Sequence, residues 1–230
     1  MKTFIQKFGI TIYLLVLMLH LFAQLLGYTI LQYGSKLILL PLLMYYFYAQ
    51  PFFGQASKTK YLILFGLFGS FLGDAFLLSD SYFIPGMIAF MTTHIFNILF
   101  FHSLQPSEGA SKNKFYIVTL VLALYCAFIY SFLKEAMGAL IYPILVYMVL
   151  ISTAAIYTIR ASMHINAKLI AGLFWTPGML FFIASDTVLA FNKFYWSSQS
   201  PIEHIGLVTM STYAIAQLLL VKGFQLYFKK

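Results

Sequence analysis

Two aspartates lie inside long apolar stretches of the chain, where an ionisable side chain is costly. Asp74 follows Gly73, and Asp186 follows Ser185. A carboxylate that faces lipid at the centre of a membrane span costs roughly 2.5–3.5 kcal/mol, so such a residue is expected to face an interior cavity. Buried carboxyls can donate and accept protons, which suits acid–base catalysis and also proton-coupled transport. The structural alternative is that each aspartate bonds nearby hydroxyls or pairs with Lys36.

Other polar side chains fall in or beside the same apolar stretches. Lys36 could meet a lipid phosphate as a point charge, or simply extend toward the outer head groups. His94 could shuttle a proton, or be a satisfied interior hydrogen-bonding group. Tyr213 and Gln217 could hydrogen-bond a substrate or a water molecule. These four residues are therefore candidates for the surroundings of the two carboxyls.

The sequence carries no metal or nucleophile motif. Its five histidines form no His-x-x-x-His pair, and its single cysteine, Cys126, has no partner in the chain. There is no Gly-x-Ser-x-Gly elbow and no phosphate-binding glycine loop. We therefore predict that the protein uses neither a metal ion nor a cofactor.

The composition places these residues in a membrane protein. Of the 230 residues, 62% are apolar and only 9% are charged, whereas a soluble domain carries roughly 25% charged residues. The net charge of +8 comes from basic residues scattered between apolar runs, so it does not indicate nucleic-acid binding. The sequence predicts an all-α integral membrane protein.

Eight apolar stretches are long enough to cross a hydrocarbon layer of ~30 Å. Each must be helical, because lipid offers no partner to an open backbone. The first is interpreted as a retained span, since no cleavage site of a signal peptide follows it. The chain is predicted to be a single transmembrane domain with spans at 8–27, 34–50, 61–79, 83–104, 115–133, 138–158, 167–190 and 203–222.

The basic residues predict the orientation of these spans. With the N-terminus in the cytoplasm, 11 of the 14 basic residues fall on the cytoplasmic side and three, Lys36, Lys134 and Lys193, on the outer side. Basic residues favour the cytoplasmic side, so both termini are predicted to lie there. At 1.5 Å per residue, Asp74 and Asp186 lie about 20 Å and about 28 Å from the inner face, in the outer half of the membrane.

The two aspartates belong to a weak internal similarity. Six residues beyond them lie Asp80 and Asn192, and the spans before them share Pro-x-x-x-Tyr, as Pro41 to Tyr45 and Pro143 to Tyr147. The unit would be four spans, giving a parallel 4+4 repeat, and membrane folds of this kind place sites where the repeats meet. Chance similarity between apolar sequences is the alternative.

The order and spacing of four motifs resemble the YhhN-like lysoplasmalogenase family over about residues 34–222. The motifs are 66–74 (GLFGSFLGD), 90–94 (FMTTH), 182–194 (FIASDTVLAFNKF) and 213–217 (YAIAQ). The chain departs from the family at Leu37, where Pro is usual, at Thr93, where Ala is usual, and at Asn97, where Tyr is common. These departures leave the two aspartates untouched and put the choice of substrate in question.

The resemblance implies hydrolysis of the vinyl ether bond of lysoplasmalogens, lipids with an ethanolamine or choline head group. A vinyl ether yields to acid, because protonation of its β-carbon forms an oxocarbenium ion that water then captures. This requires one protonated carboxyl and one carboxylate, as glycosidases use for a similar cation. Asp74 and Asp186 are the only acidic residues well inside spans. The sequence does not say which is the acid.

The remaining roles follow from the same resemblance. Lys36 would bind the phosphate, and His94 would shuttle a proton or orient a carboxylate. Asn192, Tyr213 and Gln217 would contact the glycerol or the water. The rival interpretations are a proton-coupled carrier for a small amphiphile and a structural membrane protein. The expected location is a bacterial inner membrane, with the site open toward the outer leaflet.

Overall fold

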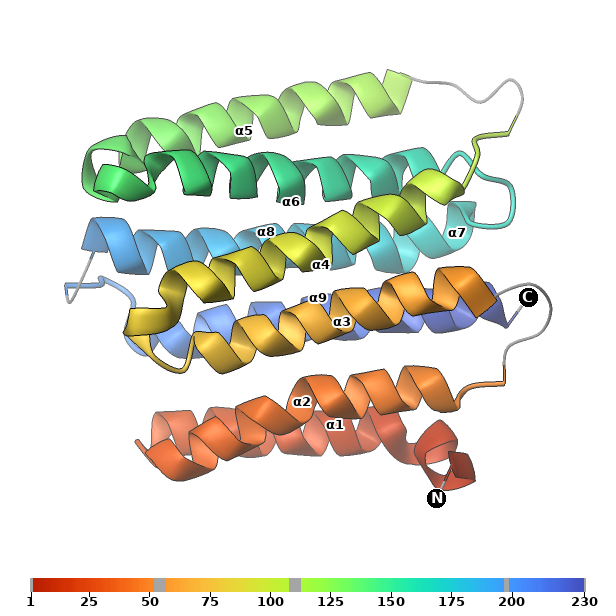
Figure 1. The fold of residues 1–230 in the computed structure, drawn as a ribbon, viewed down its shortest axis with the longest axis horizontal. Coiled ribbons are helices and arrows are strands. Elements are labelled where there is room, and N and C mark those ends of the chain that lie inside the picture. Colours follow the sequence, from red (N-terminus) through yellow and green to blue (C-terminus); the bar gives the residue numbers. More distant parts are fainter. Residues whose placement is uncertain (1, 52–56, 108–112, 197–198, 230) are drawn as a thin grey trace. The chain divides into compact units, whose positions relative to one another are not determined.

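The computed structural model of the chain describes residues 2–51, 57–107, 113–196 and 199–229, and the described residues form helices and turns without a strand (Figure 1). Lys112 and Lys230, which the sequence places on the cytoplasmic side, lie outside the described residues. The elements are α1 (Lys2–Leu25), α2 (Thr29–Ala49), α3 (Ser57–Phe76), η1 (Asp80–Tyr82), α4 (Phe83–Ser103), α5 (Asn113–Met137), η2 (Gly138–Leu140), α6 (Ile141–Ala161), α7 (Lys168–Ile170), η3 (Ala171–Trp175), α8 (Thr176–Ala190), η4 (Phe191–Trp196) and α9 (Ile205–Phe228).

Six helical stretches of the described chain are long and apolar enough to cross a membrane. One of them, Asn113–Ala161, contains two helices, α5 and α6, which the turn at η2 separates and which pack against each other. Gly138 in that turn has a φ of +52°, a conformation that glycine adopts at little cost. The predicted all-helical membrane protein is confirmed at this level.

The start of α2 differs from the prediction. Helix α1 ends at Leu25, and Gly27 reverses the chain with a φ of +73°. Helix α2 then begins at Thr29, five residues before the predicted start at residue 34. Because one left-handed glycine makes the whole turn, Lys36 lies inside α2 and not at its beginning.

A widened helical turn precedes Pro177 and Gly178. The segment η3, Ala171–Trp175, is π-helical and ends two residues before Pro177, which stands in the first turn of α8. Proline has no backbone N–H to place, so a local change of hydrogen-bond register costs little at this point.

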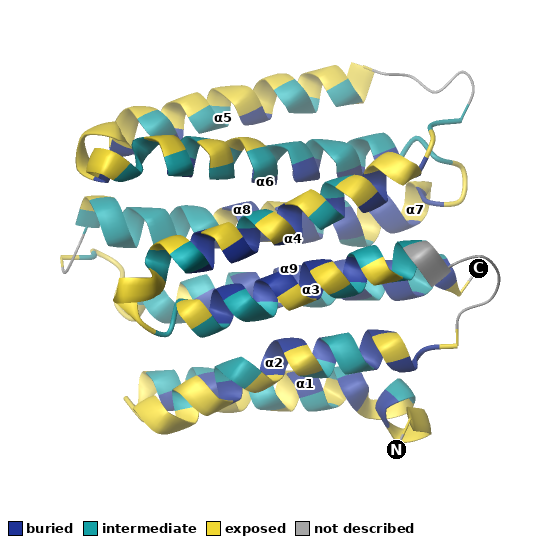
Figure 2. Cartoon of the chain, viewed as in Figure 1, coloured by how far each residue is buried: buried dark blue, intermediate teal, exposed yellow. Residues whose placement is uncertain are grey.

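Many residues along several helices are exposed (Figure 2), and a large share of these exposed residues are apolar. On α5, Leu120, Leu124 and Phe128 follow one another at helical spacing and are each more than half exposed. A soluble protein rarely exposes an apolar face of this length. Such a face is typical of a helix that contacts lipid.

The chain forms two compact units. The first comprises residues 1–100 and 220–230, and the second comprises residues 101–219. In the first unit, Phe47, Phe100 and Phe224 pack together in a buried aromatic cluster. In the second, Phe101 packs edge-on against the fully buried Trp175. Each unit contains one of the two aspartates, Asp74 in the first and Asp186 in the second.

Candidate active site

The glycines before Asp74 bring α3 directly against α4. A Cβ atom on Gly69 would lie 2.9 Å from Thr93 Oγ1 and 3.0 Å from the carbonyl oxygen of Ala89. A Cβ on Gly73 would lie 2.5 Å from the ring of Phe90. Only residues without a side chain fit at these positions, as the small-residue spacing of this helix predicts.

Thr93, on α4, forms hydrogen bonds to residues of α3. Its hydroxyl donates to the carbonyl oxygen of Gly66 at 2.9 Å and lies 3.1 Å from the hydroxyl of Ser70. An alanine, which is usual in the family at this position, would make neither contact. The departure at Thr93 is therefore explained by packing between α3 and α4 within the first unit.

Asp74 forms an ion pair with Lys36. The Lys36 Nζ lies 3.6 Å from Asp74 Oδ1, and the two side chains are 18% and 4% exposed. Lys36 lies in the second turn of α2, and its side chain contacts Asp74 on α3. The structure thus brings together two predicted site residues. The same contact is also what we expect if Asp74 has only a structural role and is paired with Lys36.

Helix α1 adds residues near this ion pair that the sequence did not single out. Tyr13 is buried and close enough to interact electrostatically with Asp74. His20 is also buried, and its Nδ1 lies 3.1 Å from the hydroxyl of Ser35, the neighbour of Lys36 in the chain. No motif marks Tyr13 or His20, so only the packing of α1 against α2 shows their position.

His94 and Asn97 lie buried in α4. His94 follows Thr93, and Asn97 comes one turn later, where its Oδ1 would lie 3.7 Å from a Cβ on Gly66. Both residues therefore belong to the α3–α4 region of the first unit, the unit that contains Asp74.

Asp186 in the second unit is held by a tyrosine from another helix. The hydroxyl of Tyr147, on α6, donates a hydrogen bond to Asp186 Oδ2, on α8. Next to it, the hydroxyls of Tyr125 and Thr187 lie 2.7 Å apart. The only signal for Tyr147 in the sequence is the Pro-x-x-x-Tyr spacing, and its counterpart Tyr45 lines a different groove in the first unit.

A small cavity of about 70 Å³ lies beside Asp186. Its polar lining comes from α5, α6 and α8: Tyr125, Cys126, Tyr147, Ser152, Asp186 and Thr187. Apolar side chains such as Ile183 complete the wall. Asp186 thus lines a small cavity formed among α5, α6 and α8.

Three predicted residues of the second unit lie apart from this cavity. Asn192 is in η4, and Tyr213 and Gln217 are on α9; none of them lines the cavity beside Asp186. Tyr213 packs edge-on against Phe182, with ring centroids 5.4 Å apart, and Gln217 is buried. These three side chains are therefore not part of the lining of the cavity beside Asp186.

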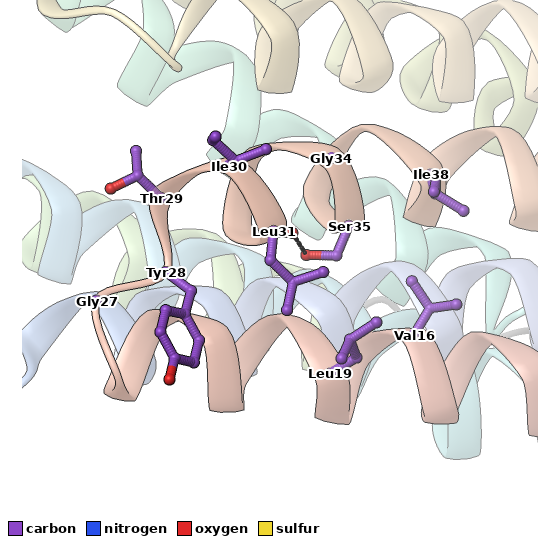
Figure 3. A pocket seen from close by; sticks show the side chains of 10 residues that line it. All are labelled: Val16, Leu19, Gly27, Tyr28, Thr29, Ile30, Leu31, Gly34, Ser35 and Ile38. Carbon is purple, nitrogen blue, oxygen red and sulfur yellow. Dashed lines mark hydrogen bonds between the residues drawn. The ribbon is translucent and has the colours of Figure 1, made fainter.

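A large hollow on the first unit lies between α1 and α2 (Figure 3). It measures about 700 Å³, and apolar side chains such as Leu19, Ile30 and Ile38 line it. Ser35 stands in its wall but donates its hydroxyl to the carbonyl oxygen of Leu31 (Figure 3). Neither Lys36 nor Asp74 lines this groove, so it offers apolar contact surface without the ionisable groups.

The side chains around Asp74 and Asp186 are suited to acid–base chemistry. Among the described residues, no three of His, Cys, Asp and Glu gather as the ligands of a metal ion would. Of the two carboxyls inside the helices, Asp74 pairs with Lys36 and Asp186 accepts a hydrogen bond from Tyr147. Two carboxyls in unlike environments can take opposite parts in a proton transfer.

Comparison with known proteins relates the chain to one family and to two curated proteins. The YhhN family model matches residues 31–224. Lysoplasmalogenase TMEM86A of Homo sapiens is 33% identical over 171 residues, which are 71% of this chain and 64% of that protein. Lysoplasmalogenase TMEM86B of Mus musculus is 29% identical over 169 residues, or 72% of this chain and 64% of that protein.

The matched region therefore spans slightly less than two thirds of the length of either relative. No solved structure matches the chain. The family match includes α3, α4, α8 and most of α9, and with them all the motifs of the predicted site. Since this match covers residues 31–224 of the 230, the chain belongs to the YhhN family.

Proposed function

We propose that the protein is a membrane hydrolase that cleaves the vinyl ether bond of lysoplasmalogens. The observation that carries this proposal is the 33% identity to a protein named lysoplasmalogenase, over 71% of the chain. The products would be a fatty aldehyde and glycerophospho-ethanolamine or -choline. Two carboxyls inside membrane helices, each with a partner, support the proposal because the reaction requires acid–base chemistry.

The reaction balances without a cofactor. An acid protonates the β-carbon of the vinyl ether, and the resulting oxocarbenium ion binds the oxygen of one water molecule as that water loses a proton to a base. The hemiacetal then breaks its bond to the glycerol oxygen, which takes back the proton held by the base, while the hemiacetal hydroxyl gives its proton to the deprotonated acid and the aldehyde leaves. One water is consumed, and the acid and base return to their starting states.

We propose that Lys36 links head-group binding to the acid step. In the structure its ammonium group pairs with the Asp74 carboxylate at 3.6 Å. A lipid phosphate would compete for this ammonium and draw it away. A buried carboxylate that loses its counterion favours the protonated state, so binding of the substrate would prepare Asp74 as the acid.

The other predicted site residues keep supporting roles in this proposal. His94, buried in the unit that contains Asp74, would orient that carboxyl or move its proton. Asn192, Tyr213 and Gln217 would contact the glycerol or the water. Substitution of Asn192, Tyr213 or Gln217 should therefore change the affinity for the lipid more than the rate of bond cleavage.

The membrane arrangement that goes with this function has eight spans, both termini in the cytoplasm, and a site open toward the outer leaflet of a bacterial inner membrane. It is supported by α3, 20 residues long, and by the division of Asn113–Ala161 into two helices. The arrangement is a single transmembrane domain with a parallel 4+4 repeat; the repeat is supported by the change from the first compact unit to the second after residue 100, near the end of α4, although residues 220–230 return to the first unit.

The decisive experiment measures aldehyde release from lysoplasmenyl-ethanolamine by the purified full chain and by Asp74→Asn and Asp186→Asn. We expect release by the wild type and a loss of about 10²–10⁴-fold in kcat for each variant, the usual contribution of a general acid or base. Circular dichroism and gel filtration confirm that each variant is folded.

Aldehyde release that survives both substitutions would contradict the two-carboxyl mechanism and keep the hydrolase. No release from folded wild type, on either the ethanolamine or the choline lipid, would contradict the hydrolase. A proton-dependent lipid flux in liposomes would then identify the protein as a carrier.

A further inference from the structure

The cavity beside Asp186 has the size and lining of a water site. Its volume of about 70 Å³ exceeds the ~30 Å³ that one water molecule occupies in the liquid. A buried water also requires two to four polar partners, and Asp186, Tyr147 and Ser152 all line this cavity. Tyr125, Cys126 and Thr187 add further polar groups to the wall, so the partners that a water molecule requires are present.

Tyr147 determines how the Asp186 carboxyl is presented to this cavity. It reaches across from α6 and donates its hydroxyl to Oδ2 of the aspartate on α8, and both residues line the cavity wall. A carboxylate that accepts a hydrogen bond on one oxygen is fixed in rotation about its side chain. It can then act on a neighbouring water in a defined direction.

Asp74 has the opposite surroundings. Its Oδ1 faces the ammonium group of Lys36, and its side chain is only 4% exposed. The two carboxyls therefore differ in a way that separates their roles, with a cation beside Asp74 and a tyrosine and a water-sized cavity beside Asp186.

From this difference we infer that Asp186 is the carboxylate that activates the hydrolytic water, that the cavity holds this water, and that Tyr147 is a positioning residue for Asp186. The inference rests on the proposed hydrolase function and assigns the acid step to Asp74. In the step assigned to Asp186, the water oxygen bonds to the oxocarbenium carbon while one water proton moves to the carboxylate. The product is the neutral hemiacetal.

Deuterium exchange into unreacted substrate tests this assignment. If capture by water is slowed, the oxocarbenium ion returns a proton from its β-carbon to Asp74 and becomes the vinyl ether again. In D₂O the recovered lipid then carries deuterium at that carbon. The probe is lysoplasmenyl-ethanolamine, incubated with the full chain in detergent and analysed by mass spectrometry.

We expect recovered substrate to contain deuterium after incubation with Asp186→Asn and none after incubation with Asp74→Asn, which lacks the acid. Unlabelled substrate with Asp186→Asn, or labelled substrate with Asp74→Asn, would overturn the assignment. Absence of aldehyde from folded wild type would overturn the proposed function itself, and with it this inference. The two failures are thus distinguishable.

Tyr147→Phe tests the positioning role, with Tyr46→Phe as its matched control. Tyr46 is also a buried tyrosine, and it donates its hydroxyl to Gln225 Oε1 at 2.8 Å instead of to an aspartate. For Tyr147→Phe we expect kcat to fall about tenfold, the worth of one hydrogen bond to a charged group, with KM changed less than about twofold and with deuterium in recovered lipid.

The control Tyr46→Phe should show wild-type kcat and unlabelled substrate. A loss of kcat that is the same in both variants, or a loss in Tyr147→Phe without deuterium in the substrate, would reduce Tyr147 to a packing residue and overturn its positioning role.

Discussion

At the scale of residues, the two aspartates have the same side chain but lie in different environments. Asp74 pairs with a lysine from α2, whereas Asp186 accepts a hydrogen bond from a tyrosine on α6. The chemical difference between two identical groups is therefore made by residues far away in the sequence. Proteins that need an acid and a base at the same pH commonly separate two carboxyls in this way.

Lys36→Met is predicted to raise KM for lysoplasmenyl-ethanolamine about tenfold, a typical value for one lost charge-assisted contact. The reason is that Lys36 is proposed to leave Asp74 and bind the phosphate. KM for an alkenylglycerol without phosphate should not rise. Steady-state aldehyde assays with both substrates make the comparison.

Two variants control this experiment. Lys36→Arg keeps the positive charge and should retain most of the affinity, while Lys134→Met removes an exposed lysine of α5 and should leave KM unchanged. An equal rise in KM on both substrates for Lys36→Met would show that Lys36 supports the fold and does not bind phosphate.

At the scale of elements, the approach of α3 to α4 positions the chain around Asp74. Gly69 and Gly73 allow contact between the helices, and Thr93 bonds Ser70 and the backbone at Gly66. Between helices surrounded by lipid, close packing and hydrogen bonds do the work that the hydrophobic effect does in water. The glycines of this motif are therefore required for close packing of α3 against α4, in addition to being part of the motif that resembles the family.

Gly69→Ala is predicted to lower the free energy of unfolding by about 1–3 kcal/mol, the usual cost of overpacking. Its Cβ would lie 3.0 Å from the backbone oxygen of Ala89, which cannot move aside as a flexible side chain can. The matched control is Gly34→Ala on α2, where a Cβ would meet nothing within 4 Å.

The measurement is thermal unfolding of both variants in the same detergent. Gly34→Ala should unfold at or slightly above the wild-type temperature, because alanine costs less than glycine in a helix interior. Equal Tm values for Gly69→Ala and the wild type would mean that α4 can move away from the added methyl group at little cost, and that the close contact of Gly69 with α4 contributes little to stability.

At the scale of the whole molecule, the distribution of basic residues makes a prediction about topology. With eight spans, the C-terminus lies in the cytoplasm and the turn between α5 and α6, at Gly138–Leu140, lies outside. A fluorescent protein fused after Lys230 should therefore be bright, and alkaline phosphatase fused there should be inactive. Phosphatase inserted at the η2 turn should be active. Active phosphatase at the C-terminus would contradict the even number of spans.

The sequence alone determined the helices and the two candidate carboxyls. Every predicted span contains a helix, because an apolar run of this length has no other way to satisfy its backbone in lipid. Asp74 and Asp186 stand out for a similar reason, since a charge in such a run is too costly to occur without a role. Neither conclusion requires knowledge of neighbouring elements.

Only the tertiary structure decided which side chains meet the aspartates. The sequence left Lys36 open between a phosphate ligand and a partner of either aspartate, and the tertiary structure places its ammonium group 3.6 Å from Asp74. Tyr147 lies 39 residues before Asp186 and carries no mark of its role, while Asn192 is close to Asp186 in the chain and does not line the cavity beside it. Such pairings depend on which helix faces pack together, and an apolar sequence leaves those faces nearly alike.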